Sequence, residues 1–267
     1  MTLPTIAMFW EGPPPGFVER LCMTSFRDAG HRVVVFSYGG LEGLPQGVEQ
    51  ASASDVLPLP DTIVRHERTG SPAVHSDKFR YHLLAGNDGI IWSDTDAYCL
   101  RPFEPTQGYF FGRETDKIVA SGVMALPAGS PTLRSLIEFC EDEYAIPPWM
   151  MPRHRRVMKE RAANGDPMHV SEMPWGAWGP KALSHFLRAH DEFRFALEPH
   201  VLYPVPFEDR RDYFRDAAKT WKRVRDDTVS IHFYGRRVRA RLHNRFAGTP
   251  PEGSILAELA LKHGVSP

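Results

Sequence analysis

Two carboxylates that stand one residue apart, Asp94 and Asp96, are the residues of this chain best suited to chemistry. They follow residues 89–93, which predict a short buried strand that rises from a turn at Asn87 and Asp88. Carboxylate oxygens at the fixed end of a strand suit Mg²⁺ or Mn²⁺, and such a cation can hold a diphosphate. The pair therefore predicts a metal site, with a solvated loop as the alternative.

A second charged pair, Asp77 and Arg80, precedes this strand. The two residues lie three apart within residues 76–84, whose pattern predicts a helix, so both side chains fall on one helical face. An arginine in that place can bind a phosphate oxygen with two hydrogen bonds. The alternatives are an ordinary surface ion pair, or Asp77 as a first-turn carboxylate that interacts with the helix dipole.

The elements that must position these residues alternate along the first half of the chain. This order is typical of a parallel α/β sheet, whose ligands bind beyond the C-terminal ends of the strands. Trp10 and Asp94 would both lie at that edge. The expected strands are 5–10, 32–36, 89–93, 109–111, 118–126 and 230–233, and the expected helices are 17–27, 76–84, 131–142, 180–190 and 255–261.

The composition narrows the class of protein. A formal net charge of -1 provides no overall field toward nucleic acid or an anionic membrane. Three cysteines, an odd number without paired spacing, favour a reducing, cytoplasmic compartment. No apolar run approaches the roughly 18 residues of a membrane span. We expect one domain over residues 1–267, with a helical and loop insertion at about 145–178.

The helix, turn and strand around Asp94 resemble the glycosyltransferases described by a sugar-binding region with a DXD motif, which are family 32 and the related α-1,4-glycosyltransferases. The matching residues are Ser76-Asp77-x-x-Arg80-Tyr81-x-Leu83-Leu84, Asp88-Gly89-Ile90-Ile91-Trp92-x-Asp94-Thr95-Asp96 and Cys99-Leu100-Arg101-Pro102-Phe103. Further matches are Phe9-Trp10, Trp178-Gly179-Pro180, Tyr203-Pro204 and Ile231-His232-Phe233-Tyr234. Two positions depart from the family pattern: Asp88 replaces the first glycine of a pair, and Tyr234 stands where tryptophan is frequent.

The resemblance implies a GT-A type fold, which is a Rossmann-like α/β structure with a mixed, mainly parallel sheet flanked by helices. It implies a metal-dependent, retaining transferase that moves a hexose from a nucleotide-sugar, with a UDP-sugar favoured, to a glycan or glycolipid acceptor in polysaccharide biosynthesis. The cation would be Mn²⁺ or Mg²⁺, held by Asp96, Asp94 and His232. The donor would contact Trp10, Asp77, Arg80, Asp94, Ser121 and Gly122, and the catalytic residues would be Asp94, Asp96 and Arg80. Neither nucleic acid nor an integral membrane segment is expected, and the protein could make a peripheral contact with the inner face of the membrane.

Several of these residues also have a purely structural interpretation. Trp10 could pack on a nucleobase or belong to the core, and His232 could be a metal ligand or a structural histidine. The arginine-rich residues 236–245 could form a solvated helix face, contact the donor diphosphate or contact an anionic acceptor such as a lipid-linked or phosphorylated glycan. The tryptophans and methionines of residues 149–178 could stack on an acceptor sugar or fill a small core.

Two other functions compete with glycosyl transfer. Phosphohydrolases of the haloacid dehalogenase type also have two aspartates after a hydrophobic strand. Here, however, Ser93 interrupts the apolar run, and Tyr98 stands where threonine or valine is usual. A non-catalytic protein that binds a sugar nucleotide or a glycan would keep the same fold. Mn²⁺-dependent hydrolysis of sugar nucleotides separates it from a transferase.

Overall fold

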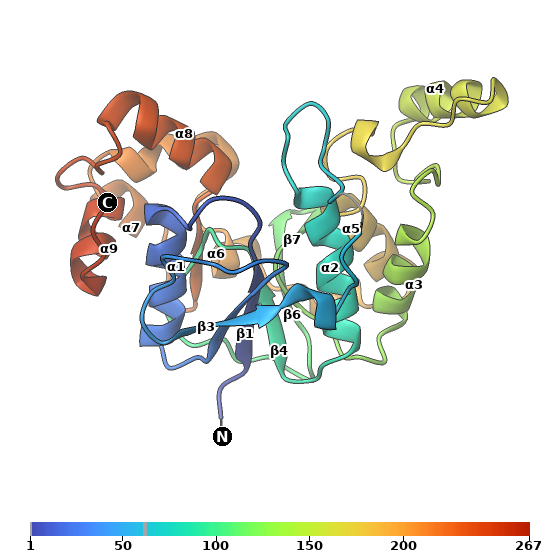
Figure 1. Ribbon diagram of the computed structural model, residues 1–267. Helices are drawn as coiled ribbons and strands as arrows, with labels where there is room; N and C mark the ends of the chain where they lie inside the picture. Colours follow the sequence, from blue (N-terminus) through green and yellow to red (C-terminus); the bar gives the residue numbers. More distant parts are fainter. Residues whose placement is uncertain (1, 61–62) are drawn as a thin grey trace.

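The computed structural model describes residues 2–60 and 63–267, and its centre is a six-stranded sheet in the order β3-β2-β1-β4-β7-β6 (Figure 1). Strands β1 to β4 are parallel to one another, whereas β7 is antiparallel to both β4 and β6. This sheet, with helices on both sides, confirms the expected α/β class and the mixed, mainly parallel sheet of a GT-A type fold. The strands are β1 (Thr5–Phe9), β2 (Val33–Ser37), β3 (Val48–Ser52), β4 (Ile90–Ser93), β6 (Phe110–Thr115) and β7 (Ile118–Ala125).

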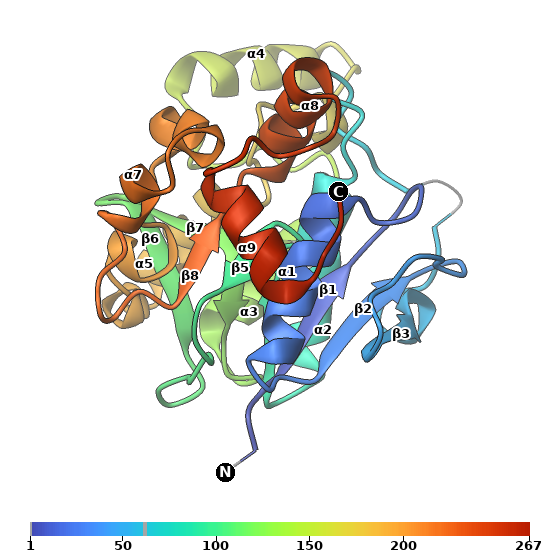
Figure 2. The ribbon, with the colours of Figure 1, turned by 90° about the vertical axis from the view of Figure 1, so that its left-hand side faces the viewer.

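Helices bury both faces of the sheet. On one face, α2 (Ala73–Ala85), α3 (Pro131–Cys140) and α5 (Pro180–Ala189) share a core with Ala7 and Phe9 of β1. On the other face, α1 (Phe17–Asp28) shares a core with Ile6 and Met8, the alternate residues of the same strand. In Figure 2, α1 lies before the sheet and the C-terminal α9 (Ile255–His263) lies against α1. Burial on both faces is why the central strands are nearly continuous apolar runs.

A second, two-stranded sheet lies beside the main one and joins distant parts of the chain. Its strands, β5 (Ala97–Cys99) and β8 (Ser230–His232), are antiparallel, with Ala97 opposite His232. The backbone N–H of Phe233 donates to the carbonyl of Asp96 over 2.8 Å. Because β5 begins directly after Asp96 and β8 ends at His232, this pairing brings the acidic motif next to the late histidine.

The predicted elements are confirmed, with ends that differ by a few residues, and two strands were missed. β3 is an exposed edge strand, and because it contains Glu49 and Gln50 next to each other, it lacks the alternation of apolar and polar residues that predicts a strand. β5 is three residues long and depends on β8 for its pairing. The remaining helices are α4 (Pro152–Ala163), α6 (Pro199–Leu202), α7 (Ala218–Trp221) and α8 (Gly235–Phe246), with 3₁₀ turns at Ala53–Asp55, Val170–Glu172, Phe193–Phe195 and Phe207–Phe214.

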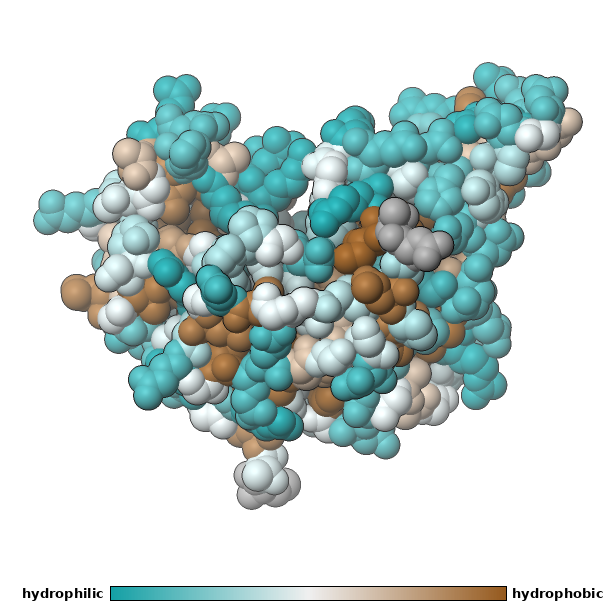
Figure 3. All heavy atoms as spheres, in the orientation of Figure 1, coloured by the Kyte–Doolittle hydropathy of each residue, from teal (hydrophilic) through white to brown (hydrophobic). Residues whose placement is uncertain are grey.

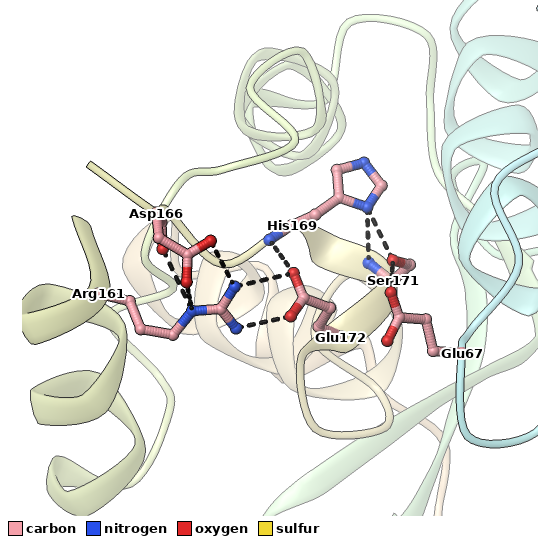
Figure 4. Close-up of polar contacts among 6 residues, drawn as sticks. All are labelled: Glu67, Arg161, Asp166, His169, Ser171 and Glu172. Carbon is pink, nitrogen blue, oxygen red and sulfur yellow. Dashed lines mark hydrogen bonds and ion pairs between the residues drawn. The ribbon is translucent and has the colours of Figure 1, made fainter. Parts of the chain in front are cut away.

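Charged side chains fix the segment between α3 and α5, which contains α4 (Figure 4). Arg161 of α4 pairs with Glu172 over 2.6 Å, and Glu172 accepts from the backbone N–H of His169 over 3.0 Å. The hydroxyl of Ser171 donates to the carboxylate of Glu67 over 3.4 Å, and the backbone N–H of Glu67 donates to the carbonyl of Ser171 over 3.0 Å. This segment is therefore tied to the loop before α2, and the two form one wall of the cavity described below.

The three cysteines, Cys22, Cys99 and Cys140, are buried and free of disulfide bonds, as their number and spacing predicted. Within residues 2–60 and 63–267, no helix has the length and apolar character needed to cross a membrane.

Candidate active site

A cavity of about 580 Å³ lies where β4 ends, between α2 and α8. In Figure 1 these two helices stand apart from each other in the upper part of the molecule, and Figure 3 shows a largely hydrophilic surface over α8. The cavity brings together every residue expected at the site except Trp10. Those that line it are Asp77, Arg80, Asp94, Asp96, Ser121, Gly122 and His232.

Arg80 is the buried centre of this site and is only 3 % exposed. Its Nη2 lies 3.3 Å from Oδ1 of Asp77 and 3.3 Å from Oδ1 of Asp94, and its Nη1 donates to the carbonyl of Ser121. The guanidinium carbon also lies 4.6 Å from the ring centroid of Trp92, whose indole N–H donates to Asp94 over 3.0 Å. These contacts hold one positive charge between two carboxylates in a single orientation.

Asp77 is buried deeply enough to change its protonation. Burial raises the pKa of this carboxyl group to about 7, because the attraction of Arg80 only partly offsets desolvation and the nearby Asp94 carboxylate adds to it. The backbone directly before α5 packs against this carboxyl group. A Cβ at Gly179 would lie only 2.8 Å from Oδ2 of Asp77, so only glycine allows this close packing. Near neutral pH, Asp77 is partly protonated and able both to donate and to accept hydrogen bonds.

Asp96 and His232 present two buried polar atoms to each other. Oδ1 of Asp96 lies 3.6 Å from Nδ1 of His232, and within the described residues neither atom has a hydrogen-bond partner. The other oxygen of Asp96 accepts from the backbone N–H of Gly235 over 2.5 Å. A Cβ at Gly235 would lie 2.8 Å from Cβ of Asp96, so only glycine allows this approach.

The donor set of this pair fits a divalent cation. In the described parts of the chain, no three His, Cys, Asp or Glu side chains form a ready-made metal cluster. Mg²⁺ needs no such cluster, since it commonly binds one or two carboxylates and takes its remaining ligands from water and substrate phosphates. The unpartnered oxygen of Asp96 and nitrogen of His232 supply such a partial set.

Asp94 lies between Arg80 and the pair of Asp96 and His232. Burial raises the pKa of its carboxyl group, Arg80 lowers it, and the Asp96 carboxylate raises it again. The backbone N–H of Asp94 donates to the carbonyl of Gly122 over 2.6 Å. A Cβ at Gly122 would lie 3.1 Å from Cε1 of His232 and 3.3 Å from Oδ2 of Asp94, so this glycine keeps open the space between the two side chains.

Trp10 lies at the end of β1, outside the lining of this cavity. Its indole N–H donates to the carbonyl of Pro13 over 2.7 Å, and the guanidinium of Arg239 lies 6.0 Å from its ring centroid. Arg239 itself pairs with the buried carboxylate of Glu19. The tryptophan is half-buried, so one part of its surface remains open to a ligand.

The tryptophans of residues 149–178 divide between core and cavity. Trp178 is 2 % exposed, and its carbonyl accepts from the hydroxyl of Tyr81 over 2.6 Å. Trp149 packs on the same core and donates to the carbonyl of Ala177 over 2.8 Å. Trp175 and Trp178 both line the cavity, and Trp175, which is 45 % exposed, has by far the larger accessible surface of these two.

Several lining residues have no local sequence signal. Burial raises the pKa of the Glu114 carboxyl group, which reaches the cavity because β6 pairs with β7. Tyr234, the residue directly before α8, is in the left-handed conformation, with φ of 54°. Further lining residues that sequence reasoning did not place in the site include Tyr203, Lys181, Phe207, His66 and Arg68. A contact of Arg236 and Arg237 with the site was one of the alternatives that the sequence left open.

No protein-family model matches this sequence, and no curated protein matches it. Among solved structures, one described as "PaToxG Glycosyltransferase" is similar, with a TM-score of 0.46 and 12 % identity over 72 % of this chain and 71 % of that chain. The CTP:phosphocholine cytidylyltransferase of Streptococcus pneumoniae is similar with a TM-score of 0.28 and 11 % identity, over 64 % of this chain and 90 % of that chain. Both TM-scores are below 0.5, and neither likeness bears on the chemistry of the site.

Proposed function

We propose that this chain is a metal-dependent glycosyltransferase that moves a hexose from a nucleotide-sugar, with a UDP-sugar favoured, to a glycan or glycolipid acceptor. One observation carries the proposal: a single cavity contains Arg80 between the carboxyl groups of Asp77 and Asp94, a group that we call the row, and next to it the pair of Asp96 and His232. Retention of configuration at the anomeric carbon is part of the proposal and rests on the resemblance of the sequence.

The row of Asp77, Arg80 and Asp94 is suited to hold the sugar. A partly protonated Asp77 offers a hydroxyl donor and an acceptor oxygen to sugar hydroxyls, and Arg80 offers fixed guanidinium donors. The volume of about 580 Å³ falls within the range of small-molecule sites. Fixing the sugar in this way would present its anomeric carbon in one orientation to the acceptor.

Asp96 and His232 would hold Mn²⁺ or Mg²⁺, with Asp94 beside them. When bound there, the cation would neutralise the negative charge that develops on the departing diphosphate. The chain adds its own positive charge on the same side, because Arg236 and Arg237 line the cavity. In the same proposal a nucleobase would stack on Trp10, outside the cavity.

The test is Mn²⁺-dependent hydrolysis of UDP-hexoses and GDP-hexoses, combined with thermal unfolding in the presence of each nucleotide-sugar. A transferase should release UDP slowly without an acceptor, and a bound donor should raise the melting temperature only when Mn²⁺ is present. A shift in melting temperature without hydrolysis would favour the non-catalytic sugar-nucleotide-binding protein. Release of phosphate from phosphate monoesters would favour the phosphohydrolase, which needs Asp94 as nucleophile although Arg80 and Trp92 occupy one of its oxygens.

A further inference from the structure

Arginines concentrate on one side of the cavity opening. Helix α8 carries five arginines and no carboxylate. The 3₁₀ segment Phe207–Phe214 packs against it, since the rings of Phe214 and Phe246 stack with centroids 5.2 Å apart. We call the following six residues of these two elements the arginine surface: Arg210, Arg211, Arg236, Arg237, Arg241 and Arg245.

Among the described residues, the guanidiniums of the arginine surface form no ion pair. Within residues 2–60 and 63–267, none of its six guanidiniums has a carboxylate within 4.0 Å, whereas the neighbouring Arg215 and Arg239 pair with Asp212 and Glu19. The 3₁₀ segment also carries Glu208, Asp209 and Asp212, and the last two of these pair with Arg223 instead. Burial and the surrounding arginines lower the pKa of Arg241, and its Nε is buried without a hydrogen-bond partner. Crowded like charges of this kind are stabilised by a bound anion.

The arginine surface extends too far to serve a donor diphosphate alone. Arg236 and Arg237 line the cavity that contains Asp96, so they are within reach of a diphosphate held there. Arg245 lies more than two turns further along α8, about 13 Å along the helix axis. Two linked phosphate groups bound at Asp96 cannot span that length, so the far end of the surface needs another anion.

We propose that the arginine surface binds the phosphate groups of an anionic acceptor glycan. This inference rests on the proposed transferase function and specifies its acceptor class. Guanidiniums bind phosphate through paired, charge-assisted hydrogen bonds, and the surface continues directly into the donor cavity at Arg236 and Arg237. The neutral end of the acceptor would enter the cavity beside the exposed Trp175, while its phosphate groups lie on α8 and the 3₁₀ segment.

The test compares two charge-reversal variants with the wild-type chain. Arg211→Glu/Arg245→Glu changes two exposed residues outside the cavity lining, and Arg153→Glu/Arg156→Glu makes the same change on the exposed side of α4. Calorimetry measures the binding of phosphorylated pentamannose and of the same pentamannose after phosphatase treatment. Co-sedimentation measures binding to phosphatidylcholine vesicles with and without phosphatidylglycerol. Mn²⁺-dependent hydrolysis of a UDP-hexose, which needs no acceptor, is measured on each protein.

We expect the wild-type chain and the α4 variant to bind the phosphorylated form at least about tenfold more tightly than the neutral form, a difference of about 1.4 kcal/mol. The Arg211→Glu/Arg245→Glu variant should lose this preference. Added salt should weaken the preference wherever it is present, because the contacts are exposed to solvent. If this variant does not fold, Arg211→Gln/Arg245→Gln takes its place with the same expectation.

Equal binding of the two pentamannoses by the wild-type chain would overturn the proposal, and so would equal losses in the two charge-reversal variants. Binding to phosphatidylglycerol vesicles that depends on Arg211 and Arg245, without binding of phosphorylated pentamannose, would assign the surface to a membrane instead. A parallel loss of UDP-hexose hydrolysis would assign it to the donor. A wild-type chain that never hydrolyses a nucleotide-sugar would count against the transferase itself, while the binding data would still decide whether the surface prefers phosphate.

Discussion

Replacing Gly122 by alanine should reduce donor turnover much more than it reduces stability. The new Cβ would lie 3.1 Å from Cε1 of His232 and 3.3 Å from Oδ2 of Asp94, so one of them must move by a few tenths of an ångström. His232 is proposed to hold the cation, and Asp94 is proposed to hold the sugar beside it. The backbone at Gly122 does not have positive φ, so alanine meets no backbone strain there.

The size of the effect follows from these distances. Misplacement of a reacting group by about 1 Å costs roughly 100-fold in rate, and the shift expected here is smaller. We therefore expect kcat/KM to fall about 10- to 100-fold, or about 1.4–2.7 kcal/mol of transition-state stabilisation. The free energy of unfolding should change by less than about 2 kcal/mol, because mild overpacking is partly offset by the lower entropy of the unfolded chain.

The assay is Mn²⁺-dependent release of UDP from a UDP-hexose, and urea unfolding measures stability. Gly129→Ala is the matched control, because a Cβ there meets no atom within 4 Å and its φ is not positive. That variant should keep wild-type turnover. Wild-type kcat/KM in Gly122→Ala would refute the idea that Asp94 and His232 act together beside this glycine. A loss of activity that only follows a loss of folded protein would refute it as well.

Four further changes test the other parts of the site. Asp96→Asn should abolish Mn²⁺-dependent UDP release at an unchanged melting temperature, since the amide oxygen can still accept from the N–H of Gly235; metal-dependent turnover in this variant would contradict the assignment. Arg80→Ala should lower the free energy of unfolding in urea by about 3 kcal/mol, because it leaves the buried carboxyl group of Asp77 and the partly exposed carboxylate of Asp94 without their cation; a loss below about 1 kcal/mol would be incompatible with the burial of Asp77 and Arg80. The folded-state pKa of Asp77 is raised from 3.8 to about 7, so its burial weakens the fold progressively as the pH rises through that window. Asp77→Asn should therefore gain stability relative to wild type on going from about pH 4 to about pH 8, and parallel stability curves would argue against the raised pKa. Trp175→Ala should lower transfer to an acceptor with little effect on urea unfolding, because this side chain is 45 % exposed; a clear loss of stability would instead make it a structural residue.

Local patterns were sufficient for the part of the site built from neighbouring elements. Helix α2 and strand β4 follow each other in the chain, and each has its own signal, a helical run and a β-branched apolar run after a turn. These patterns placed Asp77 and Arg80 on one helical face and Asp94 at the end of the next strand. The family resemblance then implied a shared site for the three side chains, which lie in contact. The helix ends were predicted less well, because the last residues of a helix depend on what packs against them.

Elements without a local signal were missed for a physical reason. β3 is a polar edge strand that exists because its backbone pairs with β2, and β5 exists because it pairs with β8 from the other end of the chain. Strand propensity describes how a side chain fits a half-buried pleated surface, so it carries little information about a short or exposed strand.

The sequence by itself determined the α/β class, the order of most elements, the acidic motif and the placement of Asp77 and Arg80 on one face of the preceding helix. Only the tertiary structure decided that Asp96 and His232 stand 3.6 Å apart, that Gly179 covers Asp77, and that the arginines of α8 border the cavity. These contacts join segments that are distant in the chain. Their formation depends on the packing of the whole core and on the entropy of closing long loops, and neither quantity can be read from a local run of residues.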